Sequence, residues 1–313
     1  MFAKSVLLAF DGSAGSRDAT QMAVSLSNAL DSPLYVVLVE DRTPTGRAIP
    51  EEPGFGAEAG DRSRGFSENE IRDEAERQAK QIEEQGGRIA GLYQRIGHPV
   101  AEILHVAEEI DAGLVVVGSR GLGRLRRKLL GSVSEGVVHH AHCAVLVARG
   151  GCGELGPAVP LVLAVDGSRE TAPATEAAAE ISRATGCPVH LVYALQIERY
   201  MPYPGPETWG GWEEDLAGAE LNARRWLEGH AEDLKANGAK TVEVHLFRGE
   251  PDGAVLRLVD TLGAGLVVLG SRGLGGIRRA LLGSVSESVM HNAGCPVMIV
   301  RRDALDSWEK GAE

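Results

Sequence analysis

The chain contains the stretch AGLVVVGSRGLGRLRRKLLGSVSE at residues 112–135 and an almost identical stretch, AGLVVLGSRGLGGIRRALLGSVSE, at residues 264–287. Twenty of the 24 paired positions are the same, at a constant offset of 152 residues. Self-similarity at one fixed spacing is the sequence signature of a structural unit that is present more than once. Whatever fold this stretch belongs to, we expect the chain to contain it twice.

The similarity extends outward from this stretch in both directions. Downstream, Cys143 pairs with Cys295 at the same offset. Upstream, LLAFDGS at 7–13 pairs with VLAVDGS at 162–168, at an offset of 155. The small difference between the two offsets indicates that loops of different length lie between the paired segments.

The length of the chain fits this duplication, because 313 residues at roughly 100–200 residues per domain amount to two domains. A Gly- and Pro-rich stretch, RGGCGELGPAVP at 149–160, has the composition of a linker. We therefore expect one domain over residues 1–152 and a second over residues 153–313.

Short apolar runs alternate with longer amphipathic stretches in each half. Most of the runs are continuous, which is typical of strands covered on both faces. The expected strands are 6–10, 34–39, 88–96, 114–117, 144–147, 161–165, 189–194, 241–247, 266–269 and 297–300. The expected helices are 14–30, 68–85, 100–110, 133–140, 171–185, 213–236, 253–262 and 285–291. This order predicts an α/β protein with two tandem, doubly wound parallel-sheet domains of five strands each, similar to flavodoxin and Rossmann folds.

Composition and charge exclude several classes of protein. With 43% hydrophobic and 24% charged residues, the chain is not mostly disordered. A net charge of −12 predicts that the protein does not bind nucleic acid, because a nucleic-acid binder needs a basic surface. No apolar run approaches the roughly 20 residues that cross a bilayer, and the apolar run before Asp11 is too short for a signal peptide. We expect a cytoplasmic protein with no membrane partner.

The cysteines and histidines do not predict a disulfide framework or a metal site. The four cysteines have no C-x-x-C spacing and are expected to be reduced and mostly buried: Cys143, Cys152, Cys187 and Cys295. Three histidines resemble a metal cluster: His139, His140 and His142. The second half has only His291 at the matching place, so a surface helix end is the preferred interpretation and no metal site is predicted.

A long loop follows the second strand of each half, at residues 41–66 and 196–211. Loops of this length are either mobile or functional. The aromatic residues near the second loop form a lid or contact surface, or else pack onto the adjacent helix: Tyr200, Tyr203, Trp209 and Trp212.

Three repeated features point to a ligand site, because ligands of open α/β sheets bind beyond the carboxyl ends of the strands. The first strand of each half ends in Asp-Gly-Ser, the fourth runs into GSRGLG, and a helix then opens with GSVSE. Glycines let a ligand approach the backbone closely, and the free N–H groups of a helix start bind phosphate. The segments are 11–13, 118–123 and 131–135 in the first half, and 166–168, 270–275 and 283–287 in the second.

The local charge favours a phosphate ligand. Five basic residues and no acid lie between Gly118 and Gly131, and three basic residues and no acid lie between Gly270 and Gly283. The alternative is a solvated basic loop. The segment is neither a Walker A loop nor a dinucleotide fingerprint, because no G-x-x-x-x-G-K-[ST] occurs and no G-x-G-x-x-G follows the first strand.

A known family carries this pattern. The spacing G-x2-G-x9-G-S occurs at Gly118, Gly121, Gly131 and Ser132, and again at Gly270, Gly273, Gly283 and Ser284. With the aspartate after the first strand of each half, the chain resembles the ATP-binding class of universal stress proteins in their tandem-domain form. The resemblance covers nearly the whole chain, including the final CPVMIV strand at 295–300.

The resemblance implies roles for particular residues. It places Asp11 and Asp166 near the adenosine, although helix capping by the Asp-Gly-Ser turn is the alternative, and the two roles are compatible. It makes Val39 the apolar adenine contact and Ala194 its smaller counterpart, which predicts unequal affinity at two sites. The other implied contacts to ribose and phosphate are Gly12, Gly118, Arg120, Gly121, Gly131, Ser132, Val133, Ser134, Gly167, Gly270, Arg272, Gly273, Gly283, Ser284, Val285 and Ser286. The two arginines face either phosphate or solvent.

The function implied is that of an ATP-binding regulatory protein of the stress response, with one adenine nucleotide in each half and Mg²⁺ brought by the phosphates. Little or no catalysis is expected, because no catalytic base or Walker-type lysine is evident. The alternatives are a slow ATPase or phosphotransferase that uses Glu51, Glu52 or Glu207, and a ligand-free dimerisation scaffold. The apolar last strand of each half, 144–147 and 297–300, predicts that the halves pair with each other, and we also expect a homodimer.

Overall fold

The computed structural model of the chain describes residues 4–41, 68–119, 130–150, 154–168, 171–196, 212–271 and 282–301. Side chains of residues 14, 68–75, 212 and 213 are also left undescribed. Several residues singled out by the sequence therefore lie outside the described part: Arg120, Gly121, Arg272, Gly273, Glu51, Glu52, Glu207 and Cys152, together with the aromatic side chains at 200, 203, 209 and 212.

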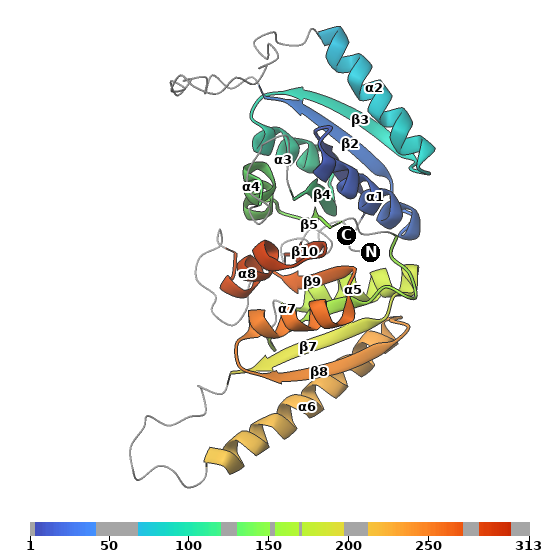
Figure 1. Cartoon of the computed structure of the whole chain (residues 1–313). Helices are drawn as coiled ribbons and strands as arrows, with labels where there is room; N and C mark the ends of the chain where they lie inside the picture. Colours follow the sequence, from blue (N-terminus) through green and yellow to red (C-terminus); the bar gives the residue numbers. More distant parts are fainter. Residues whose placement is uncertain are drawn as a thin grey trace, which may run out of the picture.

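A single ten-stranded sheet runs through the described chain in the order β3-β2-β1-β4-β5-β10-β9-β6-β7-β8 (Figure 1). The first half supplies β1 (Val6–Phe10), β2 (Leu34–Glu40), β3 (Ile89–Ile96), β4 (Leu114–Gly118) and β5 (Ala144–Ala148). The second supplies β6 (Leu161–Ala164), β7 (Val189–Leu195), β8 (Val242–Arg248), β9 (Leu266–Gly270) and β10 (Val297–Val300). Within each half every pairing is parallel and the strand order is the same. The predicted α/β architecture of two tandem doubly wound domains is confirmed.

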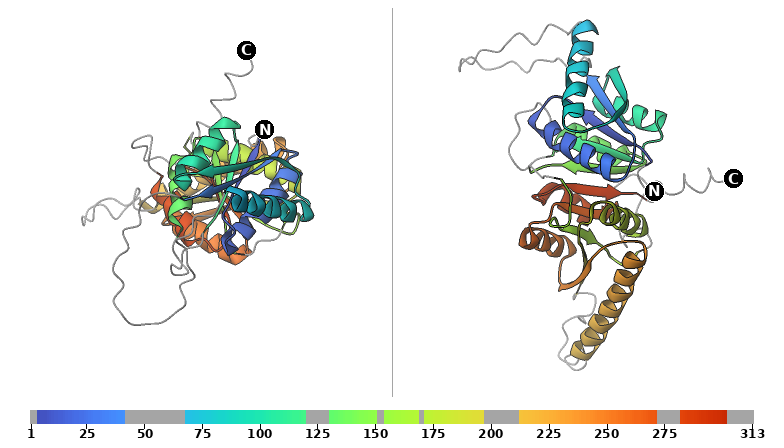
Figure 2. Two further views of the ribbon diagram at one scale, coloured as in Figure 1. Left: turned by 90° about the horizontal axis from the view of Figure 1, so that it is seen from above. Right: turned by 90° about the vertical axis from the view of Figure 1, so that its right-hand side faces the viewer.

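Helices cover both faces of the sheet. One face carries α1 (Ala14–Ala29) and α2 (Glu68–Glu84), with α5 (Ala172–Thr185) and α6 (Trp212–Ala236) in the second half. The other face carries α3 (Pro99–Glu109) and α4 (Ser132–His140), with α7 (Pro251–Leu262) and α8 (Ser284–Asn292). Figure 2 shows the two layers from the side and from above. Because neighbouring strand residues such as Leu7 and Leu8 point to opposite faces, the strands are buried on both sides, as their continuous apolar runs predict.

The two halves meet where β5 and β10 pair antiparallel, the one antiparallel contact between strands of the described chain. Val145 lies opposite Ile299, and Val147 lies opposite Val297. Each of the two hydrophobic clusters contains side chains from both halves, so the core is continuous across this junction. The expected pairing of the last strand of each half is therefore present within one chain.

Helix starts explain the small differences between the expected and observed elements. The helices expected from residues 100 and 253 begin earlier, at Pro99 and Pro251. Proline suits the first turn of a helix, because its backbone nitrogen has no hydrogen to donate and that donor would have no partner there. The sequence pattern located these helices, and the prolines set their first residues.

The cysteines that the structure describes are free thiols, and all three are buried: Cys143, Cys187 and Cys295. Burial raises the pKa of Cys143 to about 12 and also raises the pKa of Cys187, so both are inert thiols at neutral pH. Among the described helices, none combines the length and apolar character needed to cross a membrane.

Candidate functional site

The strand order of each half reverses between the first and fourth strands. From β1 the chain continues to β2 and β3 on one side, whereas β4 and β5 lie on the other side of β1. The second half reverses in the same way between β6 and β9. The crevice beyond the carboxyl ends of two such strands is where doubly wound proteins bind their ligands. Each half of this chain therefore has one such position.

The Asp-Gly-Ser turn lies at this position in the first half. Asp11 follows the last residue of β1, and its Oδ1 accepts a hydrogen bond from the backbone N–H of Ser13 at 3.0 Å. Gly12 has a φ of +76°, a conformation that glycine adopts without strain. Ser13 caps α1, and its hydroxyl oxygen accepts from the N–H of Ser16 at 3.2 Å. In the first half the turn therefore caps α1 through Ser13, whereas Asp11 holds the turn itself.

The second half repeats the turn. Asp166 Oδ1 accepts from the N–H of Ser168 at 2.9 Å, and Gly167 has a φ of +80°. Both aspartates therefore hold the backbone of the turn in the same conformation. Two acidic groups at equivalent strand ends, fixed by the same bond, are a property of the repeated unit.

The start of α4 is tied to the end of β4. The N–H of Gly131 donates to the carbonyl of Ser119 at 2.9 Å, and the hydroxyl of Ser134 donates to the carbonyl of Gly118 at 2.5 Å. Ser134 is buried, with 5% of its surface exposed. Its hydroxyl is therefore a bond between helix and strand, which gives it a role in positioning the helix start.

The start of α8 is tied to β9 by the same two bonds. Gly283 donates to the carbonyl of Ser271 at 2.8 Å, and the Ser286 hydroxyl donates to the carbonyl of Gly270 at 2.7 Å. The agreement between the halves shows that the GSVS segment folds identically in both. The repeat therefore extends from sequence to hydrogen bonding.

Both helices open with a glycine as the N-cap residue. Gly131 has φ −70° and ψ 143°, Gly283 has φ −70° and ψ 148°, and neither helix start receives a side-chain capping bond. A helix start leaves backbone N–H groups without partners inside the helix and carries a partial positive charge. Without a capping side chain, the first N–H groups of α4 and α8 remain suited to an anionic ligand such as a phosphate.

Close packing beside the crevice explains one of the predicted glycines. A Cβ atom on Gly118 would lie 2.6 Å from the backbone of Gly15, in the first turn of α1. A side chain at this position would force β4 and α1 apart. Gly118 therefore brings the end of β4 against the start of α1, which places two helix starts at the same switch point.

The two residues predicted to face adenine occupy equivalent positions with different neighbours. Val39, on β2, is half-buried and lies opposite Arg95 of β3. Ala194, on β7, is 9% exposed and lies opposite Phe247 of β8. Arg95 is held by Glu109, at 2.7 Å between Nη2 and Oε2. The residue opposite the second position is thus aromatic, whereas the residue opposite the first is an arginine.

The histidines first considered as a metal cluster lie at the end of α4. His139 and His140 occupy its last turn, and His142 forms a 4.0 Å ion pair with Glu108 when protonated. Within the described residues, the one group with the geometry of a metal site lies elsewhere, at His190, Glu243 and His245. Sequence reasoning did not single out those three residues.

Comparison with known proteins identifies the family. The model of the universal stress protein family matches residues 3–149 and again residues 160–301. This chain belongs to the universal stress protein family. The two matches show that it carries the family's domain twice, in tandem.

Individual relatives agree. A universal stress protein of Mycolicibacterium smegmatis is 36% identical over 195 residues, which are 61% of this chain and 62% of that protein, so the match spans less than two thirds of the relative. One of Mycobacterium bovis is 30% identical over 252 residues, 72% of this chain and 73% of its own. The solved universal stress protein from Archaeoglobus fulgidus has the same fold, with a TM-score of 0.65 at 24% identity, covering 96% of this chain and 99% of its own.

Shorter family members have been solved with adenine nucleotides. A universal stress protein in complex with cAMP is 26% identical and covers 46% of this chain and 96% of its own, with a TM-score of 0.35. A shorter universal stress protein from Archaeoglobus fulgidus, solved in complex with dAMP, is 27% identical and covers 46% of this chain and 98% of its own, with a TM-score of 0.33.

Proposed function

We propose that each half of this universal stress protein, residues 1–152 and 153–313, binds one adenine nucleotide at its strand switch point. ATP is the proposed ligand, with Mg²⁺ carried on its phosphates. The observation that supports this most strongly is the duplication of the site: both halves place an Asp-Gly-Ser turn and an uncapped GSVS helix start at equivalent strand ends, with the same hydrogen bonds. A feature maintained twice in one chain is a property of the repeated unit.

The proposed contacts combine the helix starts seen in the structure with the residue roles that the family resemblance implies. The first N–H groups of α4 and α8 receive the phosphates, at the positive ends of these helices. Gly131 and Gly283 present no side chain there, so phosphate can approach the backbone. Val39 and Ala194 face the base, and Asp11 and Asp166 lie on the adenosine side.

We assign a regulatory role to this binding and little or no hydrolysis. Helix N–H groups and glycines bind phosphate but do not move protons, and hydrolysis also needs a group that orients the attacking water. Steady-state turnover tests this assignment: a kcat within the usual range of about 1–10³ s⁻¹ contradicts it. We also propose that the protein acts in the cytoplasm. We further propose that two chains associate as a homodimer, and light scattering tests this by measuring the molar mass in solution.

The decisive experiment combines nucleotide release with calorimetry. Denaturing freshly purified protein should release adenine nucleotide, and titration of nucleotide-free protein with Mg·ATP should show two sites of unequal affinity. Ala194 lacks two methyl-sized groups that Val39 offers to the base. Losing this apolar contact costs on the order of 1 kcal/mol of binding free energy, which is a several-fold change in Kd. The loops 41–66 and 196–211, which differ in length and composition, also contribute to the size of this gap.

Two matched variants assign the sites. Gly131→Val should abolish binding in the first half only, and Gly283→Val in the second half only, because a branched side chain fills the space where phosphate meets the backbone. A parent stoichiometry near one, or a folded single variant that loses both sites, contradicts two independent sites.

A further inference from the structure

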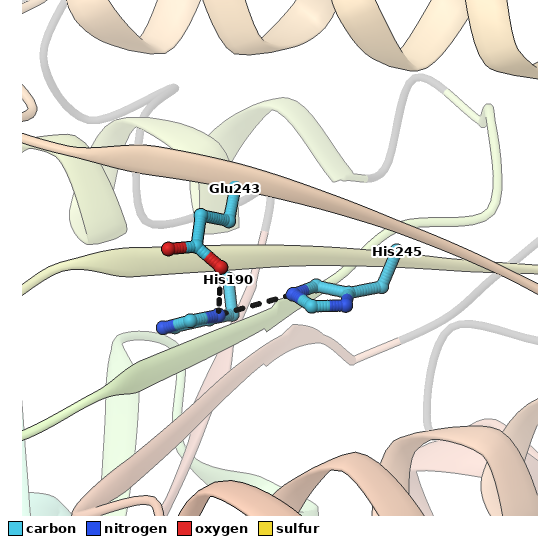
Figure 3. A group of neighbouring side chains, drawn as sticks. All are labelled: His190, Glu243 and His245. Carbon is cyan, nitrogen blue, oxygen red and sulfur yellow. Dashed lines mark hydrogen bonds and ion pairs between the residues drawn. The ribbon is translucent and has the colours of Figure 1, made fainter.

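Three side chains converge on the outer strands of the second half, away from the proposed nucleotide site (Figure 3). His190 extends from β7, and Glu243 and His245 extend from the neighbouring strand β8. The His190 Nδ1 atom lies 3.0 Å from His245 Nε2 and 3.6 Å from a carboxylate oxygen of Glu243. One ligand atom from each residue can be chosen so that all three lie within 4.8 Å of one another.

These separations are those of ligands around one small cation. Zn²⁺ binds imidazole nitrogen and carboxylate oxygen at about 2.0–2.2 Å, so two ligands of a tetrahedral site lie about 3.3 Å apart. The two contacts of His190 bracket that value. The ligand atoms of Glu243 and His245 lie within 4.8 Å of each other, so a metal held by all three residues draws these two side chains closer together.

The donor set selects the class of metal. Two imidazoles and one carboxylate suit Zn²⁺ and related transition-metal ions, whereas Mg²⁺ and Ca²⁺ prefer oxygen ligands throughout. His190 is 6% exposed and His245 is half-buried, so both imidazoles lie among packed side chains of the sheet. The Glu243 side chain is 59% exposed and gives the ion a path from solvent.

The first half of the chain shows that the cluster is not a requirement of the fold. Tyr35, Gly91 and Tyr93 occupy the positions equivalent to His190, Glu243 and His245, in the same strand register. There the two tyrosine rings lie 6.2 Å apart, and glycine makes room for them, since a Cβ atom on Gly91 would meet the Tyr35 ring at 2.9 Å. The same backbone thus carries a packed aromatic pair in one half and three metal-ligand side chains in the other.

We propose that His190, Glu243 and His245 bind one Zn²⁺ ion, which links the edge strand β8 to β7. Among the described strands β8 ends the sheet, so a metal bridge stabilises an edge that has a neighbour on one side only. His190 is near the start of β7 and Ala194 near its end. Ala194 is the fourth residue after His190, about 13 Å along the strand, so the metal site is distinct from the proposed nucleotide site.

The test is a metal titration of the full-length chain. After removal of any affinity tag and treatment with a chelator, calorimetry with zinc chloride should show one high-affinity site per chain. When Co²⁺ replaces Zn²⁺, the protein should show the visible absorption bands of tetrahedral Co²⁺. Zinc should also raise the thermal midpoint, because an ion that binds only the folded state stabilises it.

Variants locate the site. Glu243→Gln and His245→Asn should each weaken zinc binding at least tenfold. Loss of a residue that merely hydrogen-bonds to a metal ligand typically lowers metal affinity 10–100-fold, and loss of the ligand itself should cost no less. The triple variant His190→Tyr, Glu243→Gly, His245→Tyr, which copies the first half, should lose the site. Since the Glu243 side chain is largely exposed, Glu243→Gln keeps the test valid if the triple variant fails to fold.

A matched control uses the other histidine cluster. The variant His139→Asn, His140→Asn, His142→Asn should leave zinc affinity and stoichiometry unchanged. The proposal is overturned if the parent takes up no zinc, if Glu243→Gln and His245→Asn bind zinc as the parent does, or if the control variant removes the site. Without metal, the 3.0 Å contact is a hydrogen bond between the two imidazole rings.

Discussion

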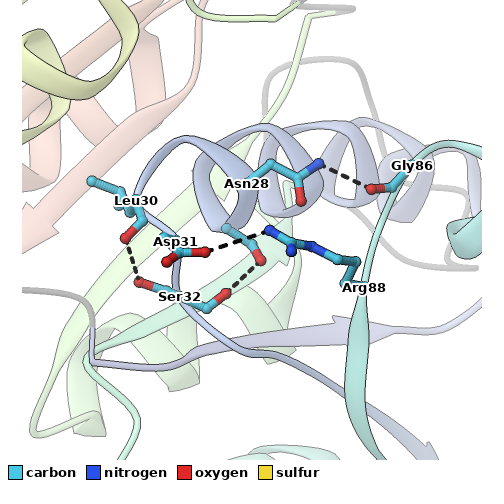
Figure 4. A network of polar contacts seen from close by, with 7 residues as sticks. Asn28, Leu30, Asp31, Ser32, Gly86 and Arg88 are labelled. Carbon is cyan, nitrogen blue, oxygen red and sulfur yellow. Dashed lines mark hydrogen bonds and ion pairs between the residues drawn. The ribbon is translucent and has the colours of Figure 1, made fainter.

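Two aspartates in the first half have the left-handed backbone conformation, and glycines occupy the equivalent positions in the second half. Asp31 and Asp111 have φ of 50° and 49°, and Gly186 and Gly263 at the equivalent positions have φ of 80° and 60°. Each residue ends a helix in the left-handed region, which is strained for a residue with a Cβ atom. Figure 4 shows Asp31 in its polar network, where its 3.5 Å pair with Arg88 is too exposed to contribute much stability.

Exchanging these residues measures the strain. Asp111→Gly should raise the free energy of unfolding by about 0.5–1 kcal/mol, and Gly263→Ala should lower it by about 1–2 kcal/mol. A Cβ atom on Gly263 would meet nothing within 4 Å, so the effect there comes from the backbone alone. Urea denaturation gives both values. Lys4→Met is the control, because it removes the same exposed ion pair and leaves the backbone at Asp111 unchanged. If Asp111→Gly lowers the free energy of unfolding more than Lys4→Met does, residue 111 is not strained.

At the scale of elements, a histidine joins α5 to α6. His230 Nε2 lies 3.0 Å from the Thr175 hydroxyl, and the Trp226 ring stacks on the imidazole at 5.3 Å between centroids. The Thr175 hydroxyl donates its one hydrogen to the carbonyl of Thr171, so Nε2 must be the donor toward Thr175. Burial lowers the pKa of His230, and the nearby Asp233 opposes the shift in part.

This shift predicts a pH dependence. The folded pKa lies below the unfolded value near 6.5, so the stability from neutral His230 is present above that pH and is lost as the pH falls toward the folded pKa. The parent should therefore lose more stability between pH 7.5 and pH 5 than His230→Gln, which keeps a donor but does not titrate. Urea denaturation at both pH values measures this, and the other histidines cancel in the comparison. Equal losses in the two proteins contradict the prediction.

The elements were predictable because each carries its own signal. Continuous apolar runs marked the strands, and the duplicated GSVSE segment marked a helix start in each half. The Asp-Gly-Ser turn was also visible, since its hydrogen bond spans two residues. Local patterns of this kind determine local structure whatever the rest of the chain does.

The cluster of His190, Glu243 and His245 was not predictable, because it depends on how β7 pairs with β8. His190 and Glu243 are far apart in sequence and meet only through the strand register. A shift of one residue would send Glu243 and His245 to the opposite face of the sheet. The cluster is also absent from the repeated pattern, because Tyr35 and Tyr93 occupy the positions of the two histidines in the first half. The Ser134 hydroxyl shows the same limit: the sequence placed it at the helix start, but not its bond to β4.

At the scale of the whole molecule, two arginines cross the junction between the halves. Arg149, after β5, donates to the carbonyls of Met290 and Ala293 at the end of α8. Arg301, after β10 and 152 residues later, donates to the carbonyls of Val138 and His139 at the end of α4. A cation at the carboxyl end of a helix opposes the negative end of its dipole and satisfies carbonyls that the helix leaves without partners. Each half thus caps a helix of the other.

If these caps hold the halves together, removing one should weaken the whole chain. Arg149→Met keeps much of the apolar stem and should lower the free energy of unfolding by about 1.5–3 kcal/mol, the range for hydrogen bonds to charged groups. Unfolding should remain one transition, because the paired strands β5 and β10 and both hydrophobic clusters still join the halves. Arg88→Met, at an exposed ion pair, is the control and should change stability by less than about 1 kcal/mol. Urea denaturation followed by circular dichroism measures both, and a loss in Arg149→Met no larger than in Arg88→Met would mean that the arginines do not hold the halves together.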